Sequence, residues 1–356
     1  MSPTKMSPIR RLAASAALIL LACALSVPRP ACAQTSAEGE PTPARLLAAA
    51  KSWGYQLQNL DPDTLAASPY DMLVIDYSRD GKAARALTPE QVDKIRVKPD
   101  GERRIVLAYL SIGEAETYRY YWKWYWGWFF GVFAPRWLGG ENPEWPGNYG
   151  VRYWQEGWQK IIFGGEDGYL ERIVKAGFDG VYLDRVDEYV DMVKEKRNAR
   201  ALMIAFVKAL AARARALKPE FLIVPQNAEA LLADPSYRAI IDGLGKEDLL
   251  FGEDVNQQPN DPKSIASNVV RLKLLTADRK PVFVVEYLDA PQEIERARKR
   301  LERYGFIPYF TDRALDAMRI GDLPDTKSPP DKKYARSGRG RASTLRAHLA
   351  GRRPRR

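Results

Sequence analysis

Residues 178–184 read Phe-Asp-Gly-Val-Tyr-Leu-Asp, a short apolar run that ends in a carboxylate. Similar runs recur along the chain, and amphipathic segments with helical spacing separate them. This alternation predicts parallel strands that are crossed by helices. The eight runs are Trp53–Asn59, Met72–Tyr77, Arg104–Gly113, Phe178–Asp184, Phe221–Asn227, Ile241–Asp248, Pro281–Leu288 and Phe306–Thr311.

Eight strand-helix units in about 270 residues predict an α/β fold of the (β/α)8 TIM-barrel type. A doubly wound open sheet has a glycine-rich turn after its first strand, and no such turn follows Trp53–Asn59. We expect the barrel to span residues 51–322. Its clearest helices are expected at Thr88–Arg96, Ala199–Lys218, Ser264–Asp278 and Pro291–Tyr304.

The positive charge of the chain lies at its two ends. The 356 residues include 55 Lys and Arg and 45 Asp and Glu, a formal charge of +10. Residues 1–34 carry four basic residues and no acid, and residues 323–356 carry eleven basic and two acidic ones, so the body between them is slightly acidic. The sequence also has no phosphate-binding glycine loop and no Cys/His cluster. We therefore expect no specific nucleic-acid partner.

Both ends are expected to lie outside the folded domain. Residues 1–33 pair basic residues with an apolar stretch and end in Ala31-Cys-Ala33, which predicts a signal peptide and export to the periplasm or the exterior. An alternative is a lipid anchor on Cys23, because Leu20-Leu-Ala-Cys23 loosely resembles a lipobox. Residues 34–50 are expected to form a linker. Residues 323–356 are expected to form a disordered basic tail, which is either a solvated extension or a contact to an anionic surface.

The only histidine, His348, lies in this basic tail. The folded body therefore has no imidazole for a Ser-His-Asp triad or a His-ligated zinc site. We expect no metal and no cofactor, and the chemistry left to the body is that of carboxylates, amides, hydroxyls, aromatic rings and cations.

Acidic and amide side chains cluster at the carboxyl ends of the predicted strands, which is where TIM barrels place their active sites. Any one of these acids is explained as a helix cap or a loop salt bridge, but seven of the eight ends carry one. Such an acidic face suits a cationic or polyhydroxylated ligand. The candidate substrate-binding residues are Asp76, Tyr109, Glu114, Asp187, Asn227 and Glu286.

Residues 118–160 form an aromatic insertion after the third strand and hold eight of the nine tryptophans. Trp and Tyr stack on sugar rings and also settle at membrane interfaces. We expect a sugar platform, with membrane contact by Trp122–Phe130 or simple packing on the barrel as alternatives. Glycines at four positions predict a loop-rich lid: Gly127, Gly131, Gly139 and Gly140.

Several motifs together resemble glycoside hydrolase family 114, the endo-α-1,4-polygalactosaminidase-like proteins. They occur in the family's order and cover about residues 50–315: Trp53-x-Tyr-Gln-Leu-Gln58, Val74-Ile-Asp-Tyr77, Ala108-Tyr-Leu-Ser-Ile-Gly-Glu-Ala-Glu116, Gly177-Phe-Asp-Gly-Val-Tyr-Leu-Asp-Arg-Val-Asp187, Pro225-Gln-Asn227 and Gly245-Lys-Glu-Asp248. The resemblance implies a TIM-type barrel that hydrolyses galactosamine-containing polymers. It implies that Asp184 is the catalytic aspartate and Glu247 the catalytic glutamate, with Glu253 as a rival for the second role.

Without histidine or metal, two carboxylates that flank one bond are the chemistry left, and that is glycoside hydrolysis. We expect Asp184 to act as nucleophile or base and Glu247 as general acid/base, with the required proton in the region of Glu247. The sequence leaves retention and inversion open. Two alternatives to a hydrolase remain at this stage: a polysaccharide-binding barrel without turnover, and a surface-anchored interaction protein.

Overall fold

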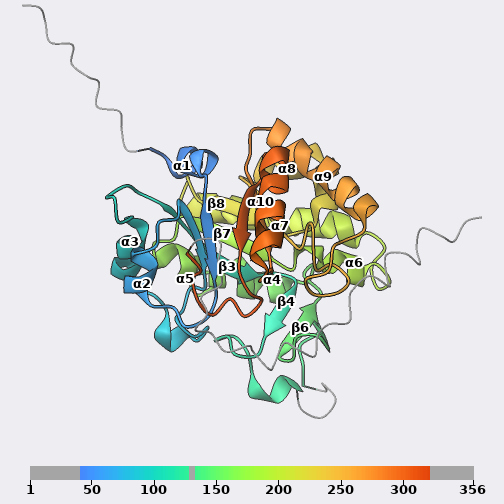
Figure 1. Cartoon of the computed structure of the whole chain (residues 1–356). Helices are drawn as coiled ribbons and strands as arrows, with labels where there is room; N and C mark the ends of the chain where they lie inside the picture. The colour runs from blue at the N-terminus through green and yellow to red at the C-terminus, as the bar shows by residue number, and fades with distance from the viewer. Residues whose placement is uncertain (1–40, 128–132, 321–356) are drawn as a thin grey trace, which may run out of the picture. The chain divides into compact units, whose positions relative to one another are not determined.

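The structure is a computed structural model that describes residues 41–127 and 133–320. All eight predicted runs contain a strand, and all eight strands are parallel to their partners (Figure 1). The predicted signal peptide, residues 34–40 of the predicted linker and the basic tail lie outside the described residues. Residues 41–50 of that linker instead contain a helix, α1 (Pro43–Ala49), whose Leu47 is buried. The strands are β1 (Trp53–Gln56), β2 (Met72–Ile75), β3 (Ile105–Ser111), β7 (Gly180–Asp184), β8 (Leu222–Pro225), β9 (Leu244–Glu247), β10 (Val282–Glu286) and β11 (Ile307–Phe310).

The strands follow one another around the barrel in chain order. Five form one sheet in the order β1-β2-β3-β7-β8, and β9, β10 and β11 form a second. The two sheets meet at a parallel bridge between Gln226 and Gly245, where the Asn227 N–H donates to the Gly245 carbonyl at 2.8 Å. At the other junction the Trp53 indole N–H of β1 donates to the Ile307 carbonyl of β11 at 3.0 Å. The fold is the predicted TIM-type barrel.

Ten α-helices are found among the described residues, and most follow a strand. The predicted helix start at Thr88 is a capping box, since the Thr88 and Gln91 side chains each bond the other's backbone N–H. The helices are α1 (Pro43–Ala49), α2 (Pro62–Ala66), α3 (Pro89–Arg96), α4 (Glu156–Phe163), α5 (Tyr169–Lys175), α6 (Tyr189–Met192), α7 (Ala199–Leu217), α8 (Pro235–Ile240), α9 (Pro262–Ala277) and α10 (Pro291–Tyr304). None of the helices in these residues is long and apolar enough to cross a membrane.

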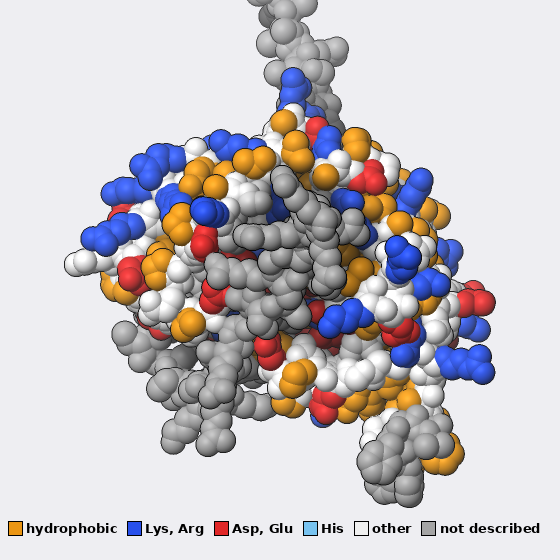
Figure 2. Space-filling model, turned by 90° about the vertical axis from the view of Figure 1, so that its right-hand side faces the viewer, with side chains coloured by type: hydrophobic (Ala, Val, Ile, Leu, Met, Phe, Trp, Pro, Cys, Tyr) orange, Lys and Arg blue, Asp and Glu red, His pale blue; other side chains and the backbone are white. Residues whose placement is uncertain are grey.

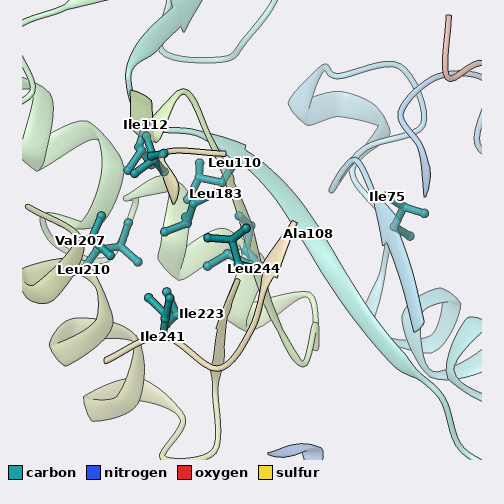
Figure 3. Close-up of a cluster of buried hydrophobic side chains, with 14 of the residues drawn as sticks. Ile75, Ala108, Leu110, Ile112, Leu183, Val207, Leu210, Ile223, Ile241 and Leu244 are labelled. Carbon is teal, nitrogen blue, oxygen red and sulfur yellow. The ribbon is translucent and has the colours of Figure 1, made fainter. Parts of the chain in front are cut away.

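Alternate residues of each strand face opposite sides of the barrel wall. Those on the outer side pack against the helices, and Figure 3 shows Val207 and Leu210 of α7 near Leu183 and Ile223 of the strands. Those on the inner side form a separate aromatic-rich cluster that includes Trp53, Tyr55, Tyr109, Tyr182, Tyr287 and Tyr309.

The inner cluster requires a glycine at position 245. A Cβ atom on Gly245 would lie 1.8 Å from the Tyr182 hydroxyl, so the ring of β7 fills the space that a side chain on β9 would occupy. A small residue on β9 therefore faces a large one on β7 in the barrel interior, as close packing demands.

Two strands of the aromatic insertion form a small antiparallel sheet with a strand just before it, and the prediction of a loop-rich lid missed this sheet. Its strands are β4 (Glu114–Glu116), β5 (Leu138–Glu141) and β6 (Asn148–Val151), in the order β4-β6-β5 (Figure 1). Gly139 is needed there because a Cβ would meet the Gly150 carbonyl oxygen at 2.6 Å. The short strands and their glycines explain why no strand pattern was visible in the sequence.

Part of the insertion is hydrophobic core. The rings of Trp126, Trp137 and Trp158 follow one another at centroid distances of 5.2 and 5.0 Å, and Trp158 is fully buried. Trp124, by contrast, is 70% exposed. Residues 128–130 of the predicted membrane contact, Trp122–Phe130, lie outside the described residues.

Candidate active site

The inward-facing positions at the carboxyl ends of the strands carry the candidate site. The alternation that buries Val285 and Tyr182 in the barrel also directs Tyr287 and Asp184 inward. Asp184 and Glu247 are partly exposed, whereas the side chains that contact them are mostly buried. The set comprises Tyr109 of β3, Asp184 of β7, Gln226 after β8, Glu247 of β9 and Tyr287 after β10.

Asp184 accepts three hydrogen bonds. The Tyr109 hydroxyl donates to its Oδ2 at 2.6 Å, and the backbone N–H of Arg185 donates to its Oδ1 at 2.7 Å. The Gln226 amide donates to the same Oδ1 at 3.2 Å. Arg185 has a left-handed backbone with φ of 57°, which turns its N–H back toward the carboxylate.

Glu247 is held by a second set of donors. Its Oε2 accepts from the Gln226 amide at 2.5 Å and from the Asn227 amide at 3.1 Å. Its Oε1 accepts from the Tyr287 hydroxyl. The Asn227 side-chain Oδ1 in turn accepts from the Glu247 backbone N–H at 3.0 Å, so the Asn227 amide bonds both the backbone and the carboxylate of Glu247.

One amide nitrogen thus connects the two carboxylates. Since Gln226 Nε2 lies 3.2 Å from Asp184 Oδ1 and 2.5 Å from Glu247 Oε2, these oxygens cannot be further apart than the sum of the two distances, 5.7 Å. Two N–H bonds at the usual 120° would place them about 5 Å apart.

Burial and the nearby charge of Glu247 raise the pKa of Asp184 to about 7, against an ordinary value of 3.8. The pair therefore retains one proton close to neutral pH. The sequence led us to expect the proton in the region of Glu247; the carboxyl of the pair whose pKa is raised is that of Asp184, because of its burial and the adjacent Glu247. Burial also raises the pKa values of Tyr109 and Tyr287, so both hydroxyls stay protonated as donors.

Of the six predicted substrate-binding residues, Tyr109 and Asn227 contact the carboxylate pair directly. The other four are acids, and each has an internal partner. Asp76 is buried and pairs with the guanidinium of Arg119 at 2.7 Å, which also bonds Glu116 at 2.7 Å. Arg119 thereby ties the insertion to the end of β2.

Glu114 and Asp187 share Arg185 as their cation. The guanidinium lies 2.9 Å from Glu114 and 3.7 Å from Asp187, and it also bonds Glu188. Because Arg185 follows Asp184 directly, this ion cluster joins β4 of the small antiparallel sheet to the strand end that carries the candidate catalytic aspartate.

Glu286 faces the outer side of the wall and not the site. Its oxygens accept the backbone N–H groups of Leu250 at 2.7 Å and Phe251 at 3.2 Å, which fixes the loop after β9. Burial raises the pKa of this carboxyl to about 8. Its predicted role in sugar binding is not supported by this geometry.

These partners change the expected electrostatics of the site. Asp76, Glu114 and Asp187 each lie in an ion pair with a buried arginine. The negative charges of these three acids are therefore largely compensated, and the strand ends do not form a strongly acidic surface. On one side of the molecule, Figure 2 shows basic side chains spread over the surface with acidic ones among them.

Glu253, the rival for the second catalytic role, lies in the loop after β9. Its Oε2 accepts from the Ser264 hydroxyl at 2.7 Å and its backbone N–H donates to Asn260. Glu247, and not Glu253, shares a donor with Asp184. Within residues 41–127 and 133–320 there is no group of three or more His, Cys, Asp or Glu side chains that is suited to a metal ion.

Comparison with known proteins identifies a glycoside hydrolase family. The sequence model of glycoside hydrolase family GH114 matches residues 33–323. The chain belongs to family GH114. Uncharacterized proteins of Deinococcus radiodurans and Thermotoga maritima are each 37% identical to it, and each alignment covers 76% of this chain and 83% of the relative.

Among solved structures, the fold of this GH114 protein is similar to the glycoside hydrolase domain of PelA from Pseudomonas aeruginosa. The TM-score is 0.56 at 17% identity, over 75% of this chain and 97% of that domain. At this identity the likeness concerns the fold.

Sequence reasoning missed Gln226, Tyr287 and Arg185 as parts of the site. The signal for Tyr287 was present, because it lies two residues after the inward-facing Val285. Gln226 was visible as a strand end, but an amide that connects two carboxylates has no motif of its own.

Proposed function

We propose that this GH114 protein is an exported glycoside hydrolase that cleaves an amino-sugar polysaccharide internally with Asp184 and Glu247. The observation that carries the mechanism is the shared Gln226 amide, which holds two partly exposed carboxylates within 5.7 Å of each other. Family membership supports hydrolysis of a glycosidic bond. Residues 1–33, with the features of a signal peptide, support export.

The separation of the carboxylates favours retention of the anomeric configuration. Retaining enzymes have carboxyl groups about 5–5.5 Å apart, whereas inverting ones need roughly 6.5–9.5 Å to admit a water molecule. In this scheme ionised Asp184 attacks the anomeric carbon, and protonated Glu247 gives its proton to the leaving oxygen. Glu247 then removes a proton from the water that hydrolyses the glycosyl-Asp184 ester.

The protonation state of the free site fits this scheme if the proton moves from Asp184 to Glu247 when the sugar binds. A single proton is shared by the pair near neutral pH, with Asp184 as the group of raised pKa. Binding of the sugar must therefore place that proton on Glu247. The developing positive charge of the oxocarbenium-like transition state favours the ionised form of Asp184 and supports this transfer.

The substrate class rests on the resemblance to polygalactosaminidase-like proteins. Because the acids around the pair have internal cations, ammonium recognition does not follow from overall charge. Partly exposed Trp122 and Tyr149, whose ring centroids lie 4.9 Å apart in the insertion, are candidates for a surface on which sugar rings stack.

The test is release of reducing ends from a partly deacetylated α-1,4-galactosamine polymer, with the fully acetylated polymer beside it. We expect Asp184→Asn and Glu247→Gln to lower turnover by at least about 1,000-fold. Glu253→Gln is the matched control and should keep it. Turnover that survives in Asp184→Asn, or that is lost in Glu253→Gln, would overturn the assignment, and a wild type that is inactive on every amino-sugar polymer tried would refute the substrate class.

The stereochemical claim has its own readout. The anomeric configuration of the first product, followed by NMR before mutarotation, should match that of the substrate. An inverted product would show that Asp184 acts as a base on water.

A further inference from the structure

Gln226 is placed to do more than fill space beneath the carboxylates. Its side chain is 2% exposed, and its single Nε2 contacts both Asp184 and Glu247. An amide NH2 group has two donor hydrogens, and here each points to a different carboxylate.

The orientation of this amide is fixed from the other side. The Tyr55 hydroxyl of β1 donates to Gln226 Oε1 at 3.2 Å. The reverse orientation would aim the amide oxygen at two carboxylates and would leave both without this donor. Tyr55 is itself buried in the inner cluster, and burial keeps its hydroxyl protonated by raising its pKa.

We propose that Gln226, held by Tyr55, is a positioning residue that sets both the spacing and the order of ionisation of the Asp184–Glu247 pair. The inference rests on the proposed function for the roles of the two acids. A donor shared by two carboxylates favours the ionised form of each and offsets part of their mutual repulsion, so the pair releases its shared proton more readily. Gln226 itself neither gains nor loses a proton.

Other groups also act on the pair and must be held constant. Tyr109, Arg185 and Asp187 influence Asp184, and Tyr55 and Tyr182 lie beneath it. Lys246, Asp248, Tyr287 and Arg313 surround Glu247. None of these contacts both carboxylates through one hydrogen-bonding atom in the described structure, which is the property that singles out Gln226.

The experiment is a pH titration of the Asp184 carboxyl carbon by 13C NMR in the full-length protein, with Asp184→Asn to assign the signal. This readout does not depend on turnover. Gln226→Met preserves the side-chain length and removes the donor, and we expect it to raise the titration midpoint of Asp184 by about one to two pH units. Tyr55→Phe removes the hydrogen bond that orients the Gln226 amide but leaves the amide in place. It should move the titration midpoint of Asp184 in the same direction by less.

The matched control is Gln56→Met. Gln56 is a buried glutamine of β1 whose amide donates to the backbone of Gln58 and Asp316, away from both acids. It should leave the midpoint of Asp184 unchanged. If Gln226→Met and Tyr55→Phe also leave the midpoint unchanged while the protein stays folded, Gln226 only fills space and the inference is wrong.

Failure of the proposed function has a different signature. In that case the midpoint of Asp184 still moves in Gln226→Met, but no polymer is cleaved by the wild type. Should Gln226→Met fail to fold, the Tyr55→Phe titration decides the question alone.

Discussion

Replacement of Asp184 by Asn is expected to stabilise the fold at neutral pH while it removes activity. The pKa of Asp184 is raised from 3.8 to about 7, so the folded state binds its proton more tightly than the unfolded state does. Between these two pH values the wild type loses stability as the pH rises, because folding then requires a proton that the unfolded chain has already released.

The size of this effect follows from the shift. About three pH units correspond to about 4 kcal/mol, and the sharing of the proton with Glu247 makes that figure an upper bound. Asn cannot ionise but still offers an oxygen to Gln226. We therefore expect the free energy of unfolding of Asp184→Asn, relative to wild type, to increase by roughly 2–4 kcal/mol from pH 4 to pH 8.

The assay is urea unfolding at one-unit pH steps, followed by tryptophan fluorescence, with the m value checked for constancy. Asp234→Asn is the control of opposite sign. Asp234 caps α8, and its hydrogen bonds to Ser236 lower its pKa. The free energy of unfolding of the wild type, relative to that of Asp234→Asn, should therefore increase as the pH rises. A difference between Asp184→Asn and wild type that is equal at pH 4 and pH 8 would refute the reasoning.

Three further changes follow from individual contacts. Tyr109→Phe removes a donor from Asp184, so the acidic limb of the pH profile of kcat/KM should move up by about one pH unit; an unmoved limb would contradict this. Arg119→Met leaves buried Asp76 and Glu116 without their cation, and it should lower the free energy of unfolding in urea by about 3–5 kcal/mol. A loss below about 1 kcal/mol, which is typical of a surface ion pair, would show that the cluster does not stabilise the fold. Gly245→Ala should destabilise by about 1–3 kcal/mol because its Cβ meets the Tyr182 hydroxyl, and Gly140→Ala, with open space around it, should be near neutral; equal effects would refute the packing argument.

Much of the barrel was predictable because each strand corresponds to a short apolar run in the local sequence. Apolar runs such as Met72–Tyr77 must be buried on both faces in a parallel barrel, and the helices between them carry their own start signals, as at Thr88. The position of Asp184 followed from the same logic, since active sites of such barrels lie at the carboxyl ends of the strands.

The partners of the acids were not predictable, because they depend on residues distant in the sequence. The sequence around Asp76 does not indicate that its partner is Arg119, 43 residues later. Glu286 and Tyr287 are adjacent, so the end of the run alone does not say which one faces the interior. The insertion sheet was missed for a related reason, since strands of three or four residues are too short to show a period.

Strand parity would have resolved part of this. In β10, Phe283 and Val285 belong to the inner cluster, so Tyr287 continues the inward series and Glu286 must face outward. The same count in β9 directs Glu247 inward with Gly245, while Glu253 lies beyond the strand.

Acids at strand ends therefore divide into two kinds. Asp184 and Glu247, at the inward-facing ends of β7 and β9, are supported by neutral donors, and burial raises the pKa of Asp184 to about 7. Those that face the insertion or the outer wall, such as Glu114 and Glu286, are satisfied by a buried cation or by backbone N–H groups and stabilise the loops that hold the first kind. Since a general acid must hold a proton near neutral pH, neutral donors such as Gln226 and Tyr109 suit the first kind better than a directly paired arginine, which would keep both carboxylates ionised.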